Sequence, residues 1–496
     1  MSRGDLKRML NPESIALIGA TEKEGSVGRD VFENLYYWSK ERQFFPVNPS
    51  RGTVFGVKCY PSILQVPEHV DLSLIEIPAT KVPGAVQECG QAGVDGIVVI
   101  SSGFREVGPE GKRLEEEIRR IREQYGMRII GPNCQGILRP WMDLNASLLK
   151  AVPKRGNIAF ISQSGALGGA IFNWAILARA GFSLFVSLGS MIDVDFGDLI
   201  DFLGSDPFTR SIILYVEEGI GQAKKFMSAV KGFARNKPIL VVKPGRFTEA
   251  VKPSRSRTGT MVTSDQVYEA AFKRAGVVRV RKVSDLFNVV RVLHVKRLPK
   301  GNRLAIVTNA SGMGVMAADA LLESGGRLAT LSEESLHRLH SILPSHWSRA
   351  NPVDVLYDAD IERYVQTVTV CLNDSGVDGV LIIYAQQERA NPPELARVIS
   401  EISNAAWKPL ITTWMGGKEA QEGRDVLFQH NVPTYETPEE AVTAYLYLYH
   451  YQRSFELLYE TPAEIPVQQA PLKIDLKALS RAPSRREERS WTRKSL

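Results

Sequence analysis

Cysteine and histidine are scarce in this 496-residue chain, and neither is arranged for metal or redox chemistry. The four cysteines lack CxxC spacing, which argues against a structural zinc site and a disulfide framework. They are Cys59, Cys89, Cys134 and Cys371. His337 and His340 stand three residues apart in "EESLHRLHSIL" without a carboxylate or third ligand in view, so we expect an exposed helix face and no metal.

Long apolar runs are also missing. No segment approaches the roughly 18 apolar residues of a membrane helix, and the N-terminus lacks the apolar region of a signal peptide. We therefore predict a cytoplasmic protein that does not enter a membrane.

Excess charge is confined to the C-terminus. The net charge is +6, and residues 477–496 hold seven Lys or Arg against two Glu, which leaves about +1 for the rest. A Ser- and Arg-rich end of this kind is typical of a solvated tail or linker, here residues 463–496, rather than of a nucleic-acid surface. We expect no nucleic-acid partner.

The sequence does contain three repeats of one pattern, in which a β-rich run precedes a glycine-bearing turn and a helix. They are "SIALIGATEKEGSVG" from Ser14, "NIAFISQSGALGGAIFNWA" from Asn157 and "RLAIVTNASGMGVMAADAL" from Arg303. This order predicts an α/β protein of three doubly wound units. Polar, proline-bearing junctions put their boundaries near residues 153 and 300, which gives units 1–152, 153–299 and 300–462.

The turn Gly19–Gly28 departs from the GxGxxG spacing of a dinucleotide site and is a weak signal alone. A plain strand–helix connection would account for it equally well. A glycine turn that opens a helix nevertheless suits a phosphate, because backbone N–H groups and the helix dipole face the anion.

The turn "SQSGALGG" offers a second anion site, in which Ser162, Ser164 and the backbone N–H groups could hold a phosphoryl or acyl group. It is not a GxSxG nucleophile elbow, because Ser162 occupies the first glycine position. A hydrolase is therefore disfavoured. Glu217 and Glu218 end a later strand, and a functional glutamate there would need a partner.

Taken together, "SIALIGAT", "GPNCQG", "ISQSGALGG", "VVKPGR", "NASGMGV" and "NPVDV" resemble, in order and spacing, the ADP-forming acyl-CoA synthetases. The resemblance covers about residues 5–460 and points to the α subunit of ADP-forming acetate–CoA ligase, a relative of the succinyl-CoA synthetase α subunit. It implies a Rossmann-like CoA-binding unit followed by two flavodoxin-like units, with the nucleotide bound by a separate ATP-grasp module. The chain is thus expected to bind coenzyme A or acetyl-CoA and to hold no nucleotide site of its own.

The resemblance also implies site residues. Gly19, Ala20, Thr21, Gly28, Asn133 and Cys134 would hold the coenzyme. Ser162, Ser164, Gly165 and Glu217 would line the pocket of the family's phosphohistidine. The family's histidine lies in a segment of the form "GRTEAGAKAASSHTG", which is replaced by "GRFTEAVKPSRSRTG", so Arg257 stands at its position. A guanidinium has no free lone pair with which to attack a phosphoryl group.

Two functions remain open from the sequence. The first is a ligase-defective, regulatory CoA-binding module, since the chain is also similar to the ligase-like part of bacterial protein lysine acetyltransferases, in which that histidine does not work. The second is the α component of an active acid–thiol ligase completed by an ATP-grasp partner chain or fused module. Either would be expected to form homo- or hetero-oligomers.

Overall fold

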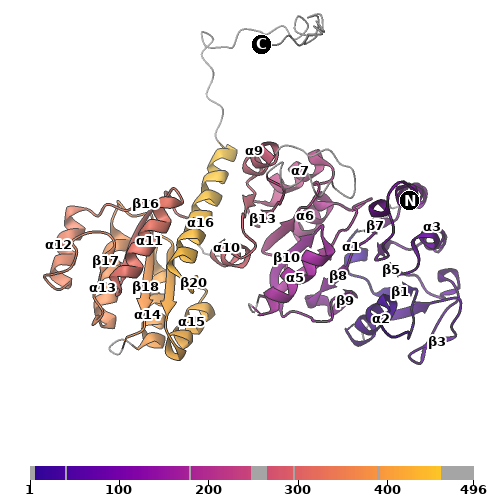
Figure 1. Cartoon of the computed structure of the whole chain (residues 1–496), viewed down its shortest axis with the longest axis horizontal. Helices are drawn as coiled ribbons and strands as arrows, with labels where there is room; N and C mark the ends of the chain where they lie inside the picture. Colours follow the sequence, from indigo (N-terminus) through magenta and orange to yellow (C-terminus); the bar gives the residue numbers. More distant parts are fainter. Residues whose placement is uncertain are drawn as a thin grey trace, which may run out of the picture. The chain divides into compact units, whose positions relative to one another are not determined.

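The computed structural model describes residues 6–38, 42–177, 180–246, 265–293, 297–387 and 391–459, and within them three largely parallel sheets, each surrounded by helices (Figure 1). Among the described helices, none combines the length and apolar content needed to cross a membrane. The tail predicted for residues 463–496 lies outside the described residues.

The first sheet is parallel, with strand order β2-β1-β5-β6-β7. Its strands are β1 (Ser14–Ile18), β2 (Gln43–Val47), β5 (Leu72–Ile75), β6 (Gly96–Val99) and β7 (Arg128–Ile130). Its main helices are α1 (Leu6–Leu10), α2 (Val27–Trp38), α3 (Val82–Gln91) and α4 (Pro109–Tyr125). A small hairpin, β3 (Thr53–Val54) with β4 (Val57–Lys58), and the 3-10 turns η1 (Ile63–Gln65), η2 (Ala79–Lys81) and η3 (Arg105–Val107) complete this part.

The second sheet has the order β14-β13-β12-β10-β11-β8-β9. Its strands are β8 (Gly136–Arg139), β9 (Leu144–Ser147), β10 (Arg155–Ser162), β11 (Phe182–Ser187), β12 (Ser211–Tyr215), β13 (Ile239–Val242) and β14 (Val278–Arg279). The turn η4 (Pro140–Met142) and helices α5 (Gly165–Leu177), α6 (Phe196–Ser205), α7 (Ala223–Phe233), α9 (Asp265–Ala275) and α10 (Asp285–Leu293) accompany them. The β8–β9 hairpin pairs antiparallel with β11, so sheet membership changes within residues 131–135, although the sequence junction lies near residue 153.

The third sheet has the order β16-β15-β18-β19-β20, and β17 also pairs with β15. Its strands are β15 (Arg303–Thr308), β16 (Arg327–Leu328), β17 (Val353–Asp354), β18 (Gly379–Ala385), β19 (Leu410–Met415) and β20 (Thr434–Tyr435). Its helices are α11 (Ser311–Glu323), α12 (Glu333–Ile342), α13 (Ile361–Asn373), α14 (Pro392–Ala405), α15 (Lys418–Gln429) and α16 (Pro438–Tyr459). In the first two sheets the first parallel strand lies between the second and the third, which is the flavodoxin-like order of a doubly wound fold. The third sheet has the same order apart from the short strand β17, which also pairs with β15.

The strands are buried on both faces, as expected of a parallel sheet covered by helices. Along β15, Leu304 and Ile306 face one apolar cluster, whereas Ala305 and Val307 face another. The cluster that holds Leu304 also includes Phe160 and other residues of the second sheet. Helix α16 reinforces this shared core, because the Tyr451 hydroxyl donates to the carbonyl oxygen of Ala234 at 3.1 Å.

Candidate functional site

The turn after β1 lies where the strand order of the first sheet reverses, between β1 and β5. Gly19 has a φ of +101°, and a Cβ atom there would lie 2.1 Å from the carbonyl oxygen of Glu76, the residue that follows β5. Only glycine fits this backbone conformation and this close approach. Ligands of open α/β sheets bind at this kind of crevice, at the carboxyl ends of the strands.

Gly28, in the first turn of α2, is needed because of a close approach alone. A Cβ atom at Gly28 would lie 2.5 Å from the carbonyl oxygen of Gly19, so the start of the helix is held against the end of β1. Between them Ala20 is buried, and the Thr21 hydroxyl accepts the Lys23 N–H at 3.2 Å. The turn therefore brings the positive end of a helix to the reversal point, where a phosphate would be stabilised.

Asn133 and Cys134 follow β7 at the same edge of the sheet and have different environments. Asn133 is exposed, has a φ of +56°, and donates its N–H to the carbonyl oxygen of Ser101 at 3.0 Å. The Cys134 thiol is buried, donates to the carbonyl oxygen of Val99 at 3.2 Å, and has its pKa raised to about 12, chiefly by burial. Only Asn133 presents its side chain to solvent, whereas the thiol holds the segment in place.

Glu76 is a residue of this crevice that the sequence did not indicate. Its carboxyl group is largely enclosed, and burial raises its pKa to about 7. The Oε2 atom is buried and has no hydrogen-bond partner among the described residues. The sequence gives only a glutamate at the end of an apolar run, "VDLSLIEIP", which is a weak sign of such an environment.

In the second domain, the turn after β10 is built from its own serines. The Ser162 hydroxyl is buried and donates to the carbonyl oxygen of Ser164 at 2.6 Å, while the Ser164 hydroxyl accepts the Leu167 N–H at 3.4 Å. A Cβ atom at Gly168 would lie 2.9 Å from the Ser162 hydroxyl. The buried Ser162 hydroxyl thus stabilises the turn through its hydrogen bond to Ser164, and α5 begins directly afterwards, at Gly165.

Gln163 connects this turn to the end of β12. Its Oε1 atom accepts the N–H groups of Glu217 and Glu218 at 2.8 and 2.9 Å. The Lys243 ammonium, at the end of β13, donates to the carbonyl oxygen of Glu217 at 3.0 Å, and burial lowers its pKa. The structure therefore brings the turn and Glu217 to one edge of the sheet and adds Lys243 to them. The signal for Lys243 in the sequence is its place as the charged residue directly after the apolar strand of "VVKPGR". Arg257 lies outside the described residues.

The third domain repeats the arrangement without an evident catalytic group. Asn309 of "NASGMGV" exchanges two hydrogen bonds of 2.8 Å with the backbone of Ala385, at the end of β18. The Ser311 hydroxyl donates to Asp354 of "NPVDV" at 2.7 Å. His337 and His340 are both exposed on α12. These motifs hold the carboxyl ends of β15, β17 and β18 together.

One cluster of His69, Asp71 and Asp95 has the composition of a metal site, with ligand atoms within 4.8 Å of one another. Both carboxylates are already engaged. Asp71 accepts the N–H groups of Glu13 and Ser14, and Asp95 accepts His69 at 2.8 Å and pairs with Arg8 at 3.3 Å. These contacts account for the cluster without a metal, because they connect the residues at the starts of β1, β5 and β6.

A junction loop, residues 188–195, connects the crevice of the first domain to the second domain. The N–H groups of Ser190, Ile192 and Val194 donate to the carbonyl oxygens of Pro132, Gly131 and Ile129 at 2.9, 3.3 and 3.1 Å. The loop therefore runs along β7 and the segment that ends at Asn133. These bonds attach a loop of the second domain to the backbone just before Asn133.

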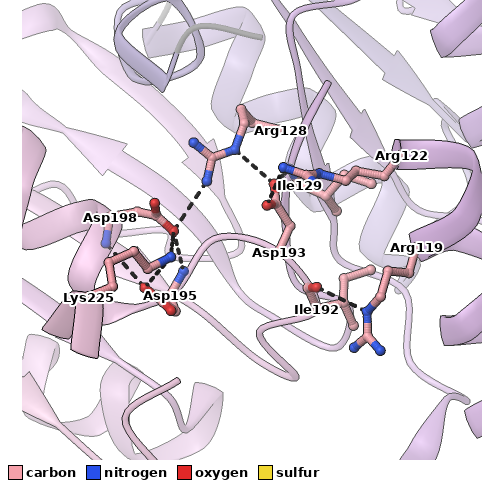
Figure 2. Close-up of polar contacts among 9 residues, drawn as sticks. All are labelled: Arg119, Arg122, Arg128, Ile129, Ile192, Asp193, Asp195, Asp198 and Lys225. Carbon is pink, nitrogen blue, oxygen red and sulfur yellow. Dashed lines mark hydrogen bonds and ion pairs between the residues drawn. The ribbon is translucent and has the colours of Figure 1, made fainter. Parts of the chain in front are cut away.

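Charged side chains fix the junction loop (Figure 2). Asp193 accepts from Arg122 at 2.8 Å, from Arg128 at 2.9 Å and from the Ile129 N–H at 2.9 Å. Arg128 also pairs with Asp198 at 3.2 Å. Burial acts to raise the pKa of Asp198, but the hydrogen bond from Lys225, at 2.8 Å, and the charge of Arg128 lower it overall. These ion pairs join α4 and β7 to α6 and α7.

Family models match all three domains. A CoA-binding domain matches residues 13–140, a succinyl-CoA ligase-like flavodoxin domain matches residues 155–293, and a ligase-CoA domain matches residues 304–459. The fold and these matches define an α/β chain of the CoA-ligase class.

Known proteins identify the family within that class. The chain is 39% identical over 445 residues to the α subunit of ADP-forming acetate–CoA ligase II of Pyrococcus furiosus, covering 88% of this chain and 96% of that subunit. It is 37% identical to ADP-forming acetate–CoA ligase I of Archaeoglobus fulgidus, covering 90% of this chain but only 64% of that longer protein. The chain belongs to the ADP-forming acetate–CoA ligase family, and it corresponds to the family's α subunit.

A solved structure supports the same conclusion. The dinucleotide-forming acetyl-coenzyme A synthetase 1 of Ca. Korarchaeum cryptofilum has a TM-score to this chain of 0.82 in its apo form and 0.83 in complex with phosphate and ADP. In the complex the identity is 36%, and the match covers 93% of this chain and 99% of that chain. The predicted α/β class and the predicted family are thereby confirmed.

Proposed function

We propose that the chain binds coenzyme A or acetyl-CoA in the crevice formed by the turn Gly19–Gly28 and the segment at Asn133. The observation that carries this proposal is the close packing of Gly19 against the end of β5 and of Gly28 against Gly19. At both positions a Cβ atom would collide with a backbone carbonyl oxygen, so the turn is fixed in this conformation by its glycines. A diphosphate bound there would face the first turn of α2. The match of residues 13–140 to a CoA-binding domain supports the same ligand.

We further propose that the chain is ligase-defective and acts as a regulatory, CoA-responsive module. Arg257 occupies the predicted phosphohistidine position, and a guanidinium remains protonated and lacks a nucleophilic lone pair. Nearby serines and threonines could form phosphate esters, but such esters are too stable to return the phosphoryl group readily. Arg257 would hold an anion instead of relaying it, in the pocket that Ser162, Ser164, Gly165 and Glu217 would line.

The second candidate is the α component of an active ADP-forming acid–CoA ligase, completed by an ATP-grasp partner chain. The observation that favours it is how much of each relative's length is matched. The match spans 96% of a relative that is a separate α subunit but only 64% of a relative that is one longer chain. In this case the nucleotide would be bound by the partner, and another group would replace the histidine relay.

Calorimetry of the full chain with coenzyme A and with acetyl-CoA tests ligand binding. Asn133→Asp keeps a residue that tolerates a positive φ but adds a negative charge to the crevice, so we expect at least a tenfold weaker affinity. Asn404→Asp makes the same change at an exposed position of α14 and should leave the affinity within twofold. Absence of binding by the unmodified chain at millimolar ligand would refute the proposal.

Turnover separates the two candidates. The chain is mixed with ADP or ATP, acetate and coenzyme A, with and without a candidate ATP-grasp chain. The regulatory proposal expects no acetyl-CoA formation above the level of the partner alone. Formation that requires both chains would instead establish the second candidate.

A further inference from the structure

Glu76 lies beside the glycine turn of the proposed coenzyme site. It follows β5 directly, and its carbonyl oxygen is the atom that a Cβ at Gly19 would strike. Its N–H donates to the carbonyl oxygen of Ile18 at 2.9 Å, so its backbone is fixed between the ends of β1 and β5. The side chain therefore arises beside the turn that would hold the coenzyme diphosphate.

Among the described residues, no hydrogen bond or ion pair accounts for the burial of the Glu76 carboxyl group. Its Oε2 atom is buried without a hydrogen-bond partner among the described residues, and no ion pair to Glu76 is found among them. A buried acceptor without a partner costs roughly 1–3 kcal/mol, and an enclosed carboxylate without a cation costs more. A group of this kind is explained most simply by a ligand that completes its contacts.

A carboxylate and a diphosphate repel each other at close range. A neutral carboxyl group offers an O–H that can donate to a phosphate oxygen, whereas the ionised form only accepts. We propose, building on the coenzyme site proposed above, that Glu76 contacts the bound coenzyme in its protonated form, so that the site takes up one proton with the ligand. The proton comes from water, and no covalent bond changes.

Burial raises the pKa of Glu76 to about 7 in the free chain. Near and above this pH the carboxyl group is partly or largely ionised, so ligand binding can return a proton to it. Of the groups around it, the Cys134 thiol interacts with Glu76 and has a pKa raised to about 12, so it stays neutral. The charged groups on the neighbouring turns and on the start of α2 are Glu22, Lys23, Glu24, Arg29 and Asp30 around the turn after β1, Lys81 on η2, and Arg105 and Glu106 on η3. Among them Glu22 is paired with Arg51 at 3.7 Å, Arg29 with Glu33 at 2.7 Å, and Arg105 with Glu115 at 2.6 Å.

The test measures affinity against pH with the full chain and dephospho-CoA. This probe lacks the 3′-phosphate, whose second ionisation near pH 6 would add a titration of the ligand itself. Above the free pKa, affinity should fall about tenfold per pH unit, or roughly 30-fold between pH 6 and pH 8.5. Calorimetry at pH 8 in two buffers of different ionisation enthalpy should show nearly one proton taken up per ligand.

Two variants define the cause. Glu76→Gln is neutral at every pH and still donates, so it should bind at pH 8.5 as tightly as at pH 6, without proton uptake. Glu88→Gln changes another partly buried acid of the same domain, on α3, and should keep the pH slope of the unmodified chain.

Each contrary result has a distinct meaning. A flat pH profile in the unmodified chain, or weaker binding by Glu76→Gln throughout the range, would overturn this inference while leaving coenzyme binding intact. Failure of the unmodified chain to bind at any pH would overturn the proposed function as well.

Discussion

At the scale of single residues, the crevice depends on atoms that are absent as much as on atoms that are present. Gly19 and Gly28 matter because they lack a Cβ, and the sequence could indicate them through their place between a strand and a helix. Glu76 could not be found in this way. Its neighbours include Cys134, which is 58 residues further along the chain, so a reading of one segment does not bring them together.

Substitution of Gly19 by valine should abolish coenzyme binding. The new side chain would collide with the carbonyl oxygen of Glu76 and would have to adopt a φ of +101°, so the turn must open. We expect a loss of more than 100-fold by calorimetry. Gly52→Ala in the same domain meets nothing within 4 Å and should bind normally. Native-like affinity of Gly19→Val would show that the ligand does not use this turn.

Glu76 should also make the stability of the unliganded chain depend on pH. Its folded pKa of about 7 lies above the ordinary value of 4.5, so the folded state binds more protons between these values. Stability from this group is therefore present below pH 4.5 and is lost as the pH rises to about 7. Glu76→Gln should be more stable than the unmodified chain by about 1–3 kcal/mol at pH 8 and similar to it at pH 4.5. Urea unfolding at both pH values checks this, and an equal difference at both would contradict it.

At the scale of elements, the repeated β-turn-α pattern predicted the central strands well, because strands buried on both faces leave uninterrupted apolar runs such as "IAFIS" in β10. The β8–β9 hairpin was harder. Its strands are short, and their partner β11 lies more than thirty residues further along the chain. The junction loop was also missed, since the acids of "MIDVDFGD" do not reveal which domain they face.

Asp193 should be the residue on which the junction loop depends most. Its side chain is only 8% exposed and holds two arginines, so Asp193→Asn leaves their charges poorly compensated. We expect a loss of about 2–4 kcal/mol in unfolding free energy, together with weaker coenzyme binding. Asp143→Asn breaks an ion pair whose carboxylate is 62% exposed and should cost less than about 0.5 kcal/mol. Equal effects of the two substitutions in denaturant unfolding would refute this assignment.

At the scale of the whole molecule, three units of one strand order share apolar clusters with their neighbours in the sequence. The sequence predicted the number of units and their class, and the family comparisons confirmed the class. It could not supply the contacts between units, because hydrogen bonds such as that of Tyr451 to Ala234 join residues more than two hundred positions apart.

Histidine phosphorylation should be absent from the complete chain. Incubation with ATP, phosphate and an ATP-grasp partner should leave no acid-labile, base-stable phosphate, since no histidine lies between residues 70 and 293. Radiolabelling followed by acid and base treatment measures this. Label on His294, His337 or another histidine during turnover would show that the relay has moved. Arg257→His is compared in parallel, and it should become labelled only if Glu217 orients the imidazole.

The junction loop has a further consequence for β7, which is the last strand of the first sheet. An uncovered edge strand is a template for pairing with other chains and therefore an aggregation hazard. Here the Ile129 carbonyl accepts the Val194 N–H, and the Ile129 N–H is bound by the Asp193 carboxylate. A fragment that ends near residue 140 would expose these groups, so the first domain produced alone should self-associate through β7 unless the second domain accompanies it.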